Sequence, residues 1–163
     1  MTTQTMTQTI PVRLDFDAAA PGFSKAMGTL DRAATRALDD AGIEPRLREL
    51  VRIRASQLNG CAYCIDMHTK DARAIGETEQ RIYALPAWRE TPFFTASERA
   101  ALAFTESVTL LASTHVPDAD YAAVAAEFGP AQVGALVALI VAINAWNRIG
   151  VATRAWEPGS YQP

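Results

Sequence analysis

Hydrophobic residues recur every three or four positions along most of the chain from Pro21 onward. This spacing places apolar side chains on one face of an α-helix, because an α-helix turns once every 3.6 residues. The pattern predicts an amphipathic helix over residues 22–40, which stops before Gly42. Its apolar residues are Phe23, Met27, Leu30, Ala34 and Leu38.

Proline and glycine residues divide the rest of the pattern into separate helices. Pro45 and Pro130 suit the first turn of a helix, whereas Gly60, Gly76 and Gly129 suit its end. No stretch alternates between apolar and polar residues for long enough to indicate a β-strand. The fold class predicted is therefore all-α, a helical bundle. The further predicted helices cover residues 45–59, 61–75, 77–85, 96–113, 118–129 and 130–154.

Local signals around residues 86–97 predict how two of these helices end and begin. Pro86 closes the short helix before it, and Ser97 is the expected N-cap of the helix that follows the loop at residues 91–95. Aromatic residues near a loop can line a substrate entry, but they are more often part of the core. We therefore expect Trp88, Phe93 and Phe94 to be buried.

The last predicted helix is apolar on more than one face between Val133 and Ile143. Such a helix lies at the centre of a bundle or is shared between subunits, so we expect either a core position or a homo-oligomer. The apolar run stops at Asn144 and is shorter than the roughly 20 residues that a membrane-spanning helix needs. We therefore expect no membrane insertion.

The composition indicates an ordinary globular protein. A chain of 163 residues with 49% hydrophobic and 20% charged residues is sufficient for one domain with a core. We expect that domain over residues 16–156, between a flexible leader of residues 1–15 and a tail of residues 157–163. The net charge of −3 offers no basic face for nucleic acid. The N-terminal residues lack the basic and apolar regions of a secretion signal, so a cytoplasmic location is expected.

Both cysteines and one of the two histidines lie within the stretch "NGCAYCIDMH", residues 59–68. On one helix, Cys61, Cys64 and His68 fall within roughly 60° of one another and point the same way. The cysteines begin that helix, where free backbone N–H groups favour an anion and lower the pKa of a thiol. A disulfide between residues three apart is accessible there, and this is the usual arrangement of a redox dithiol.

Other uses of two cysteines compete with a redox pair. Covalent haem attachment requires a histidine directly after the second cysteine, and Ile65 stands there. Zinc could be held by Cys61, Cys64 and His68 together with a carboxylate. Structural zinc sites, however, usually take their remaining ligands from a second cluster of cysteines or histidines. The other histidine, His115, is alone in an expected surface loop. We therefore expect no bound metal. A structural disulfide across so short a loop would stabilise little, and two buried unreactive thiols are the remaining alternative.

A dithiol that turns over also needs a path for protons. His68, one turn beyond Cys64, is placed to take the proton of that thiol, and a carboxylate would orient the imidazole. Glu49 in the preceding helix is the candidate, although a glutamate there is usually solvated or paired with an arginine such as Arg52. The helix start favours Cys61 as the more acidic thiol and the histidine favours Cys64. The residues alone leave the attacking thiol open.

Glu49, the two cysteines and His68 together resemble the core of alkylhydroperoxidase D (AhpD), within the carboxymuconolactone decarboxylase-like family. The resemblance rests on the glutamate twelve residues before the first cysteine and the histidine four after the second, and it extends over residues 47–76. It implies an all-helical subunit assembled as a homotrimer or hexamer. It also implies that Cys64 attacks a hydroperoxide, that Cys61 resolves the sulfenic acid as a disulfide, and that His68 and Glu49 relay the proton.

The same resemblance implies an antioxidant oxidoreductase of alkylhydroperoxidase or peroxiredoxin type. Its partners would be a small or organic hydroperoxide and an external dithiol, such as a dihydrolipoyl group or a thioredoxin-like protein, with no tightly bound cofactor. The best-known peroxidase members carry a further histidine where this chain has Tyr63, which puts the strength of the activity in question. Two alternatives stay open: a decarboxylase-like lyase of aromatic catabolism, although that branch lacks the two-cysteine motif, and a non-enzymatic redox-sensing oligomer.

Overall fold

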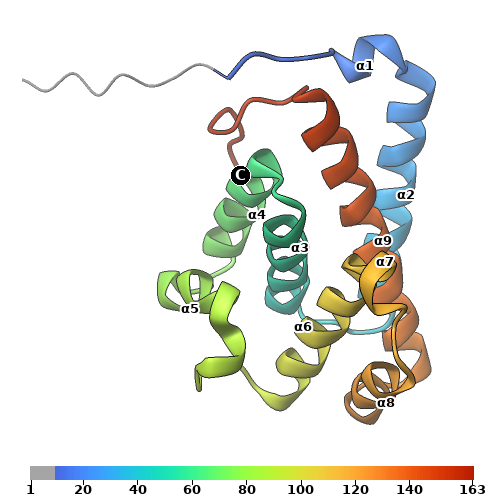
Figure 1. The fold of residues 1–163 in the computed structure, drawn as a ribbon, viewed down its shortest axis with the longest axis vertical. Helices are drawn as coiled ribbons and strands as arrows, with labels where there is room; N and C mark the ends of the chain where they lie inside the picture. Colours follow the sequence, from blue (N-terminus) through green and yellow to red (C-terminus); the bar gives the residue numbers. More distant parts are fainter. Residues whose placement is uncertain (1–9) are drawn as a thin grey trace, which may run out of the picture.

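Two long helices, α2 (Pro21–Asp40) and α9 (Pro130–Thr153), pack against each other along one flank of the molecule (Figure 1). The computed structural model describes residues 10–163, and no residue in that range belongs to a β-strand. The predicted all-α fold is confirmed. The remaining elements are α1 (Phe16–Ala19), α3 (Pro45–Asn59), α4 (Ala62–Ala74), α5 (Glu79–Ala84), the 3-10 helix η1 (Leu85–Glu90), α6 (Ala96–Thr109), α7 (Leu111–Thr114) and α8 (Asp118–Glu127).

Helix α3 is the element around which the site is built. It packs against α4 on one side and against α6 and α9 on others, so its residues line the centre of the bundle. The largest core cluster joins α3 to α2, α6, α8 and α9, and it includes Leu38, Val51, Leu136, Leu139 and Ile140, all fully buried. This packing fixes α3 from several directions and gives α4 a rigid support.

Local chemistry explains most helix boundaries. Pro45 and Pro130 occupy the first turns of α3 and α9, as expected from their fixed φ and missing N–H. Gly60 follows α3 with φ 69°, a left-handed conformation that favours glycine. The predicted N-cap at Ser97 is wrong: Thr95 caps α6, in a reciprocal capping box with Glu98.

Three other features of the elements were not predicted. The predicted helix over residues 96–113 is broken at Leu110, whose φ of −92° and ψ of 31° leave the α region, so α7 is a separate turn. The short helix α5 ends at Ala84, before Pro86 as predicted, but the 3-10 helix η1 follows it, and Pro86 lies in the first turn of η1, where no N–H partner is needed. The short helix α1, capped by Asp15, was not distinguished from the sequence pattern.

Trp88 and Phe94 are buried in a second core cluster and Phe93 packs against it, so the predicted core role of these aromatics is confirmed.

By length and composition, α9 is the one helix among residues 10–163 that is suited to crossing a membrane, although its apolar run is shorter than the helix. In this fold it serves as the core helix that contacts α2, α3 and α6. The core helix of a protein that is not in a membrane can be as apolar as a membrane-spanning helix.

The segments before and after the bundle meet at the end of α9. Residues 1–9 of the predicted leader lie outside the described residues. Further along, the backbone N–H groups of Arg13 and Leu14 both donate to the carbonyl of Thr153, at 2.9 and 3.1 Å. The chain after α9 then turns back towards α4, where its last residues lie (Figure 1).

Candidate active site

The turn between α3 and α4 positions the two cysteines. The left-handed Gly60 reverses the chain after α3, so α4 runs back along α3. Cys61 is the N-cap residue of α4, Cys64 lies in its first turn and His68 in the next. All three are buried, with exposed fractions of 2%, 3% and 6%. The structure therefore brings the predicted thiols and imidazole together along one helix.

The two thiols differ in acidity because they share a proton. A hydrogen bond with Cys64 lowers the pKa of Cys61 to about 7, although burial opposes this shift. The backbone N–H groups of Tyr63 and Cys64 at the helix start lower it further. The same hydrogen bond and burial raise the pKa of Cys64. In the resting pair the negative charge is therefore favoured on Cys61 and the proton on Cys64.

His68 is held by a buried ion pair from α3. Its Nδ1 donates to Oε2 of Glu49 at 2.9 Å, and Oε1 of Glu49 accepts from Arg52 at 2.5 Å. Burial acts to raise the pKa of Glu49, but the hydrogen bond to His68 and the charge of Arg52 together lower it. Glu49 is thus a carboxylate at neutral pH, and it orients the imidazole so that Nε2 is free for other chemistry.

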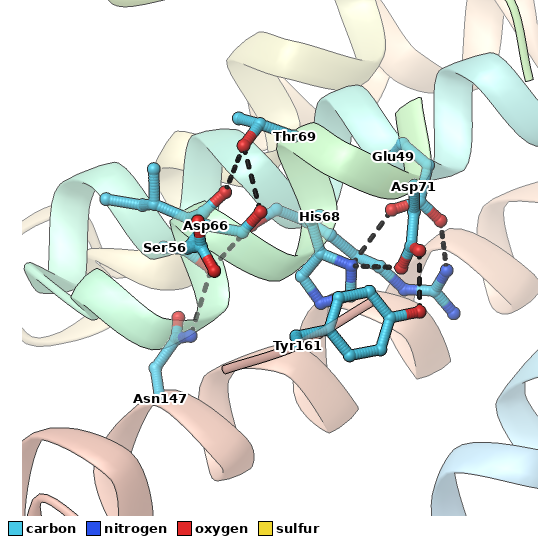
Figure 2. Close-up of polar contacts among 10 residues, drawn as sticks. Glu49, Ser56, Asp66, His68, Thr69, Asp71, Asn147 and Tyr161 are labelled. Carbon is cyan, nitrogen blue, oxygen red and sulfur yellow. Dashed lines mark hydrogen bonds and ion pairs between the residues drawn. The ribbon is translucent and has the colours of Figure 1, made fainter. Parts of the chain in front are cut away.

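Two further residues complete this polar cluster, and sequence reasoning missed both. Asp71 Oδ2 lies 3.8 Å from Nδ1 of His68, and Asp71 Oδ1 accepts a hydrogen bond from the hydroxyl of Tyr161 at 2.7 Å. Figure 2 shows Asp71 between the imidazole and the tyrosine hydroxyl. Asp71 follows His68 by three residues on one helix, which is a usable signal. Tyr161 lies 90 residues away in sequence, and no local pattern indicates it.

A buried amide network lies between the thiol turn and α9. Asn59 Nδ2 donates to the side-chain oxygens of Asn144 and Asn147 at 3.0 and 2.9 Å. Asn147 Nδ2 donates in turn to Ser56 Oγ at 3.0 Å, a contact visible in Figure 2. A hydrogen bond from Asn147 also acts to lower the pKa of each cysteine. This network was not predicted from the sequence, although the interruption of the apolar run at Asn144 is a signal that could have indicated it.

The two cysteines open onto different cavities. Cys64 and His68 line a cavity of about 500 Å³, together with Arg52, Asp71 and the aromatic residues Tyr63, Trp146 and Trp156. Cys61 lines a neighbouring cavity of about 400 Å³ that also includes the glycine at position 150. The rings of Tyr63 and Trp156 lie 5.7 Å apart and contribute to both linings. The side chains of Tyr63 and Trp156 therefore lie between the two cavities.

Gly150 in α9 allows the close approach of the Cys61 thiol. A Cβ atom at this position would lie 3.1 Å from Cys61 Sγ and 3.5 Å from the ring of Trp156. A side chain there would have to displace the thiol or the indole. Glycine in the interior of a helix normally costs about 1 kcal/mol relative to alanine, so this position has a packing reason.

Zinc was considered as one use of Cys61, Cys64 and His68, and no metal was expected. Among the described residues, the group with suitable ligand atoms within 4.8 Å of one another is Glu49, His68 and Asp71, without either cysteine. Each carboxylate in that group already accepts a hydrogen bond, from Arg52 or from Tyr161. The positive charge of Arg52 also opposes a cation. His115 is exposed, at the end of α7.

Comparisons of the sequence with known proteins find a family and a relative. The model of the carboxymuconolactone decarboxylase family matches residues 21–107. An uncharacterized protein of Bacillus subtilis, YdfG, is 45% identical over 140 residues, which cover 86% of this chain and 92% of YdfG.

Solved structures show the same fold. A protein of unknown function from Agrobacterium tumefaciens, for which a role as the antioxidant defence protein AhpD has been suggested, is 37% identical. It superposes with a TM-score of 0.84 over 91% of this chain and 99% of its own. An uncharacterized peroxidase-related protein from Ralstonia eutropha JMP134, with an alkylhydroperoxidase AhpD core, is 22% identical. It has a TM-score of 0.75 over 88% of this chain and 74% of its own, which supports the fold alone.

Proposed function

The chain belongs to the carboxymuconolactone decarboxylase family, and from this premise we propose that it is a thiol-dependent peroxidase that reduces small or organic hydroperoxides. One observation carries the proposal. Cys64 and His68 line the same cavity, and the far side of His68 is fixed by a buried carboxylate 2.9 Å from its Nδ1. A thiol and an imidazole on one cavity, with a carboxylate that orients the imidazole, support nucleophilic catalysis by Cys64.

In the first step, the sulfur of Cys64 attacks the terminal peroxide oxygen and the O–O bond breaks. The Cys64 thiol becomes a sulfenic acid and the hydroperoxide becomes an alcohol. His68 takes the thiol proton and returns it to the leaving alkoxide, so no net proton is gained or lost. Glu49 stabilises the imidazolium between these transfers.

In the second step, Cys61 attacks the sulfur of the sulfenic acid at Cys64. A disulfide forms between the two residues, and hydroxide leaves as water after protonation. A resolving thiol is effective when it is already a thiolate, and the pKa of Cys61 at about 7 favours that state near neutral pH. The acidity of Cys61 is compatible with this resolving role, and the choice of Cys64 for the attack is supported by the resemblance to the AhpD core and by the cavity that Cys64 shares with His68.

The third step restores the dithiol. Two electrons and two protons from an external dithiol reduce the disulfide, and the reductant itself becomes a disulfide. A dihydrolipoyl group or a thioredoxin-like protein would meet this requirement. The apolar part of the Cys64 cavity, with Ile143, Trp146 and Trp156, suits the organic portion of a hydroperoxide.

The proposal is tested by counting free thiols before and after one molar equivalent of an organic hydroperoxide, with and without dihydrolipoamide. Two thiols should be lost on oxidation and regained with the reductant. Cys64→Ser should abolish peroxide-dependent consumption of dihydrolipoamide. Cys61→Ser should still form a sulfenic acid, trapped by dimedone, but should not turn over. Turnover by the Cys64→Ser protein at the wild-type rate would falsify the assignment of the attacking thiol.

The same experiment separates the alternatives. Stoichiometric oxidation without turnover would favour a redox-sensing protein. Lactone decarboxylation that survives replacement of both cysteines would favour a lyase.

We also propose that the chain assembles as a homotrimer or hexamer. Exposed apolar side chains lie on α2 and α9, among them Phe23 (58% exposed), Leu30 (42%) and Val141 (49%). Apolar side chains exposed on neighbouring helices support burial against another subunit. Light scattering of the purified protein should give three or six times the mass of the chain, and Phe23→Glu should reduce it.

A further inference from the structure

The segment after α9 is attached to α4 by three hydrogen bonds. The backbone N–H of Gly159 donates to Asp66 at 2.9 Å, and Lys70 Nζ donates to the backbone carbonyl of Tyr161 at 2.9 Å. The hydroxyl of Tyr161 donates to Asp71 at 2.7 Å. Trp156, which begins this segment, packs against Tyr63. What the sequence predicts as a tail is therefore an ordered strap across the helix that carries Cys64 and His68.

Two carboxylates lie near His68 Nδ1, and the strap contacts one of them. Glu49 lies on one side of this nitrogen and is held by Arg52; Asp71 lies on the other and is held by Tyr161 (Figure 2). Each carboxylate therefore has its own donor. Arg52 lies on the same helix as its carboxylate, whereas Tyr161 comes from the strap.

This arrangement acts on the charged form of the histidine. When His68 takes the Cys64 proton it becomes an imidazolium, and two carboxylates near Nδ1 stabilise that charge. Asp71 is partly exposed, with 27% of its side chain accessible, so its carboxylate needs a partner to stay directed inward. The hydrogen bond to Asp71 raises the pKa of Tyr161 to about 12, so the hydroxyl remains a donor throughout the physiological range.

We propose that Tyr161 is a positioning residue for the proton relay: its hydroxyl holds Asp71 beside His68, and the imidazolium is thereby stabilised. The proposal rests on the proposed peroxidase function, because it assigns a role within that proton transfer. Tyr161 is not among the residues that line the Cys64 cavity, and it lies outside the stretch that contains both cysteines and His68.

The test begins with Tyr161→Phe, which keeps the ring and the backbone contact with Lys70 but removes the hydroxyl. The expected fall in kcat is about five- to tenfold, as for the loss of one hydrogen bond to a charged group, with KM for the hydroperoxide unchanged. Tyr83→Phe is the matched control, since Tyr83 is 74% exposed, and should leave kcat unchanged. A wild-type kcat in the Tyr161→Phe protein would overturn the proposal.

A double-mutant cycle separates positioning from general support of the fold. Asp71→Asn should lower kcat, and adding Tyr161→Phe in that background should cause no further fall, because the hydroxyl then has no carboxylate to hold. Fully additive losses would overturn the proposal. Loss of this hydrogen bond should lower the free energy of unfolding, so kcat of the four proteins is compared at a temperature at which each is fully folded.

A second measurement does not depend on peroxide chemistry. In the Cys61→Ser background, the rate of Cys64 alkylation by iodoacetamide reports how readily its proton is removed, and Tyr161→Phe should slow it. If the wild-type protein fails to reduce hydroperoxides while alkylation still slows, the peroxidase proposal fails and the positioning role stands. If turnover is present but neither kcat nor alkylation changes, the positioning role fails alone.

Discussion

Helix α3 contributes to two ion clusters that look alike and differ in one partner. Glu49 is paired with Arg52 and His68, and Glu106 of α6 is paired with Arg54 at 2.7 Å and with the indole N–H of Trp88 at 2.8 Å. In both, burial alone would raise the pKa of the carboxyl, and the hydrogen-bond donors lower it. A buried carboxylate with arginine partners is therefore common to both clusters.

The difference lies in the third partner. The donors to Glu106 are arginines and an indole, and none of them releases a proton at physiological pH. Glu49 is paired with His68. The other ring nitrogen of His68 can exchange a proton with a group in the cavity that His68 and Cys64 both line. A buried charge is thus weak evidence for a site, and a titratable partner beside a nucleophile is much stronger.

The largest expected effect is on activity, in Glu49→Gln. Removing the negative charge leaves the imidazolium of His68 without its main partner, so kcat should fall by about 100-fold or more, within the range for general acid–base catalysis. The measurement is steady-state turnover of an organic hydroperoxide. A fall of less than threefold would mean that Glu49 is as structural as Glu106.

Glu106→Gln should give the opposite result. The amide leaves Arg54 without its counter-charge, so the free energy of unfolding should fall by about 2–4 kcal/mol, as when one partner of a partly buried ion pair is removed. Urea denaturation measures this, and kcat at a temperature where the protein is folded should stay at the wild-type value. A loss of kcat equal to that of Glu49→Gln would break the distinction between the clusters.

Acid should affect both clusters together. The pKa of each carboxyl is lowered by folding, so each contributes stability that is present above its unfolded value of about 4.5 and lost as pH falls through the folded value. The free energy of unfolding should therefore decline below about pH 4.5. The decline should be smaller in Glu49→Gln and in Glu106→Gln, each measured against wild type by urea denaturation at pH 6 and at successively lower pH. A decline of wild-type size in both variants would contradict the shared electrostatic origin.

The smallest effect concerns Cys61, the hydrogen-bond partner of Cys64. Ultraviolet absorbance of the thiolate should rise with a midpoint near the Cys61 pKa of about 7. Cys64→Ala removes the hydrogen-bond donor and should move that midpoint up towards 9, whereas Cys64→Ser keeps a hydroxyl donor and should move it less. An unchanged midpoint in Cys64→Ala would show that the helix start alone sets the acidity of Cys61.

The periodicity of apolar residues was sufficient to predict where the main helices lie, but it did not predict all of their ends. The apolar spacing predicted α2, α3 and α9 closely, because each buries one or more faces against its neighbours. The break at Leu110 was missed, since nothing in the local pattern shows that Thr114 Oγ1 bonds back to the carbonyl of Ser107. Such a contact belongs to the tertiary structure.

The sequence predicted those site residues that lie close together along the chain. Cys61, Cys64 and His68 were found because helical spacing alone places them together. Asn147 and Tyr161 were not, because their contacts with α3 and α4 join residues about ninety positions apart. Tyr161 was assigned to a tail, and nothing in its composition distinguishes a strap from a free end.

Gly150 has a consequence for how this sequence can change over evolutionary time. An alanine Cβ at this position would lie 3.1 Å from Cys61 Sγ, so the thiol would have to shift by a few tenths of an ångström, while alanine favours the helix. We expect positions 61 and 150 to covary among relatives. Where the first cysteine is lost, selection for glycine in the last helix should relax, and larger residues should appear there.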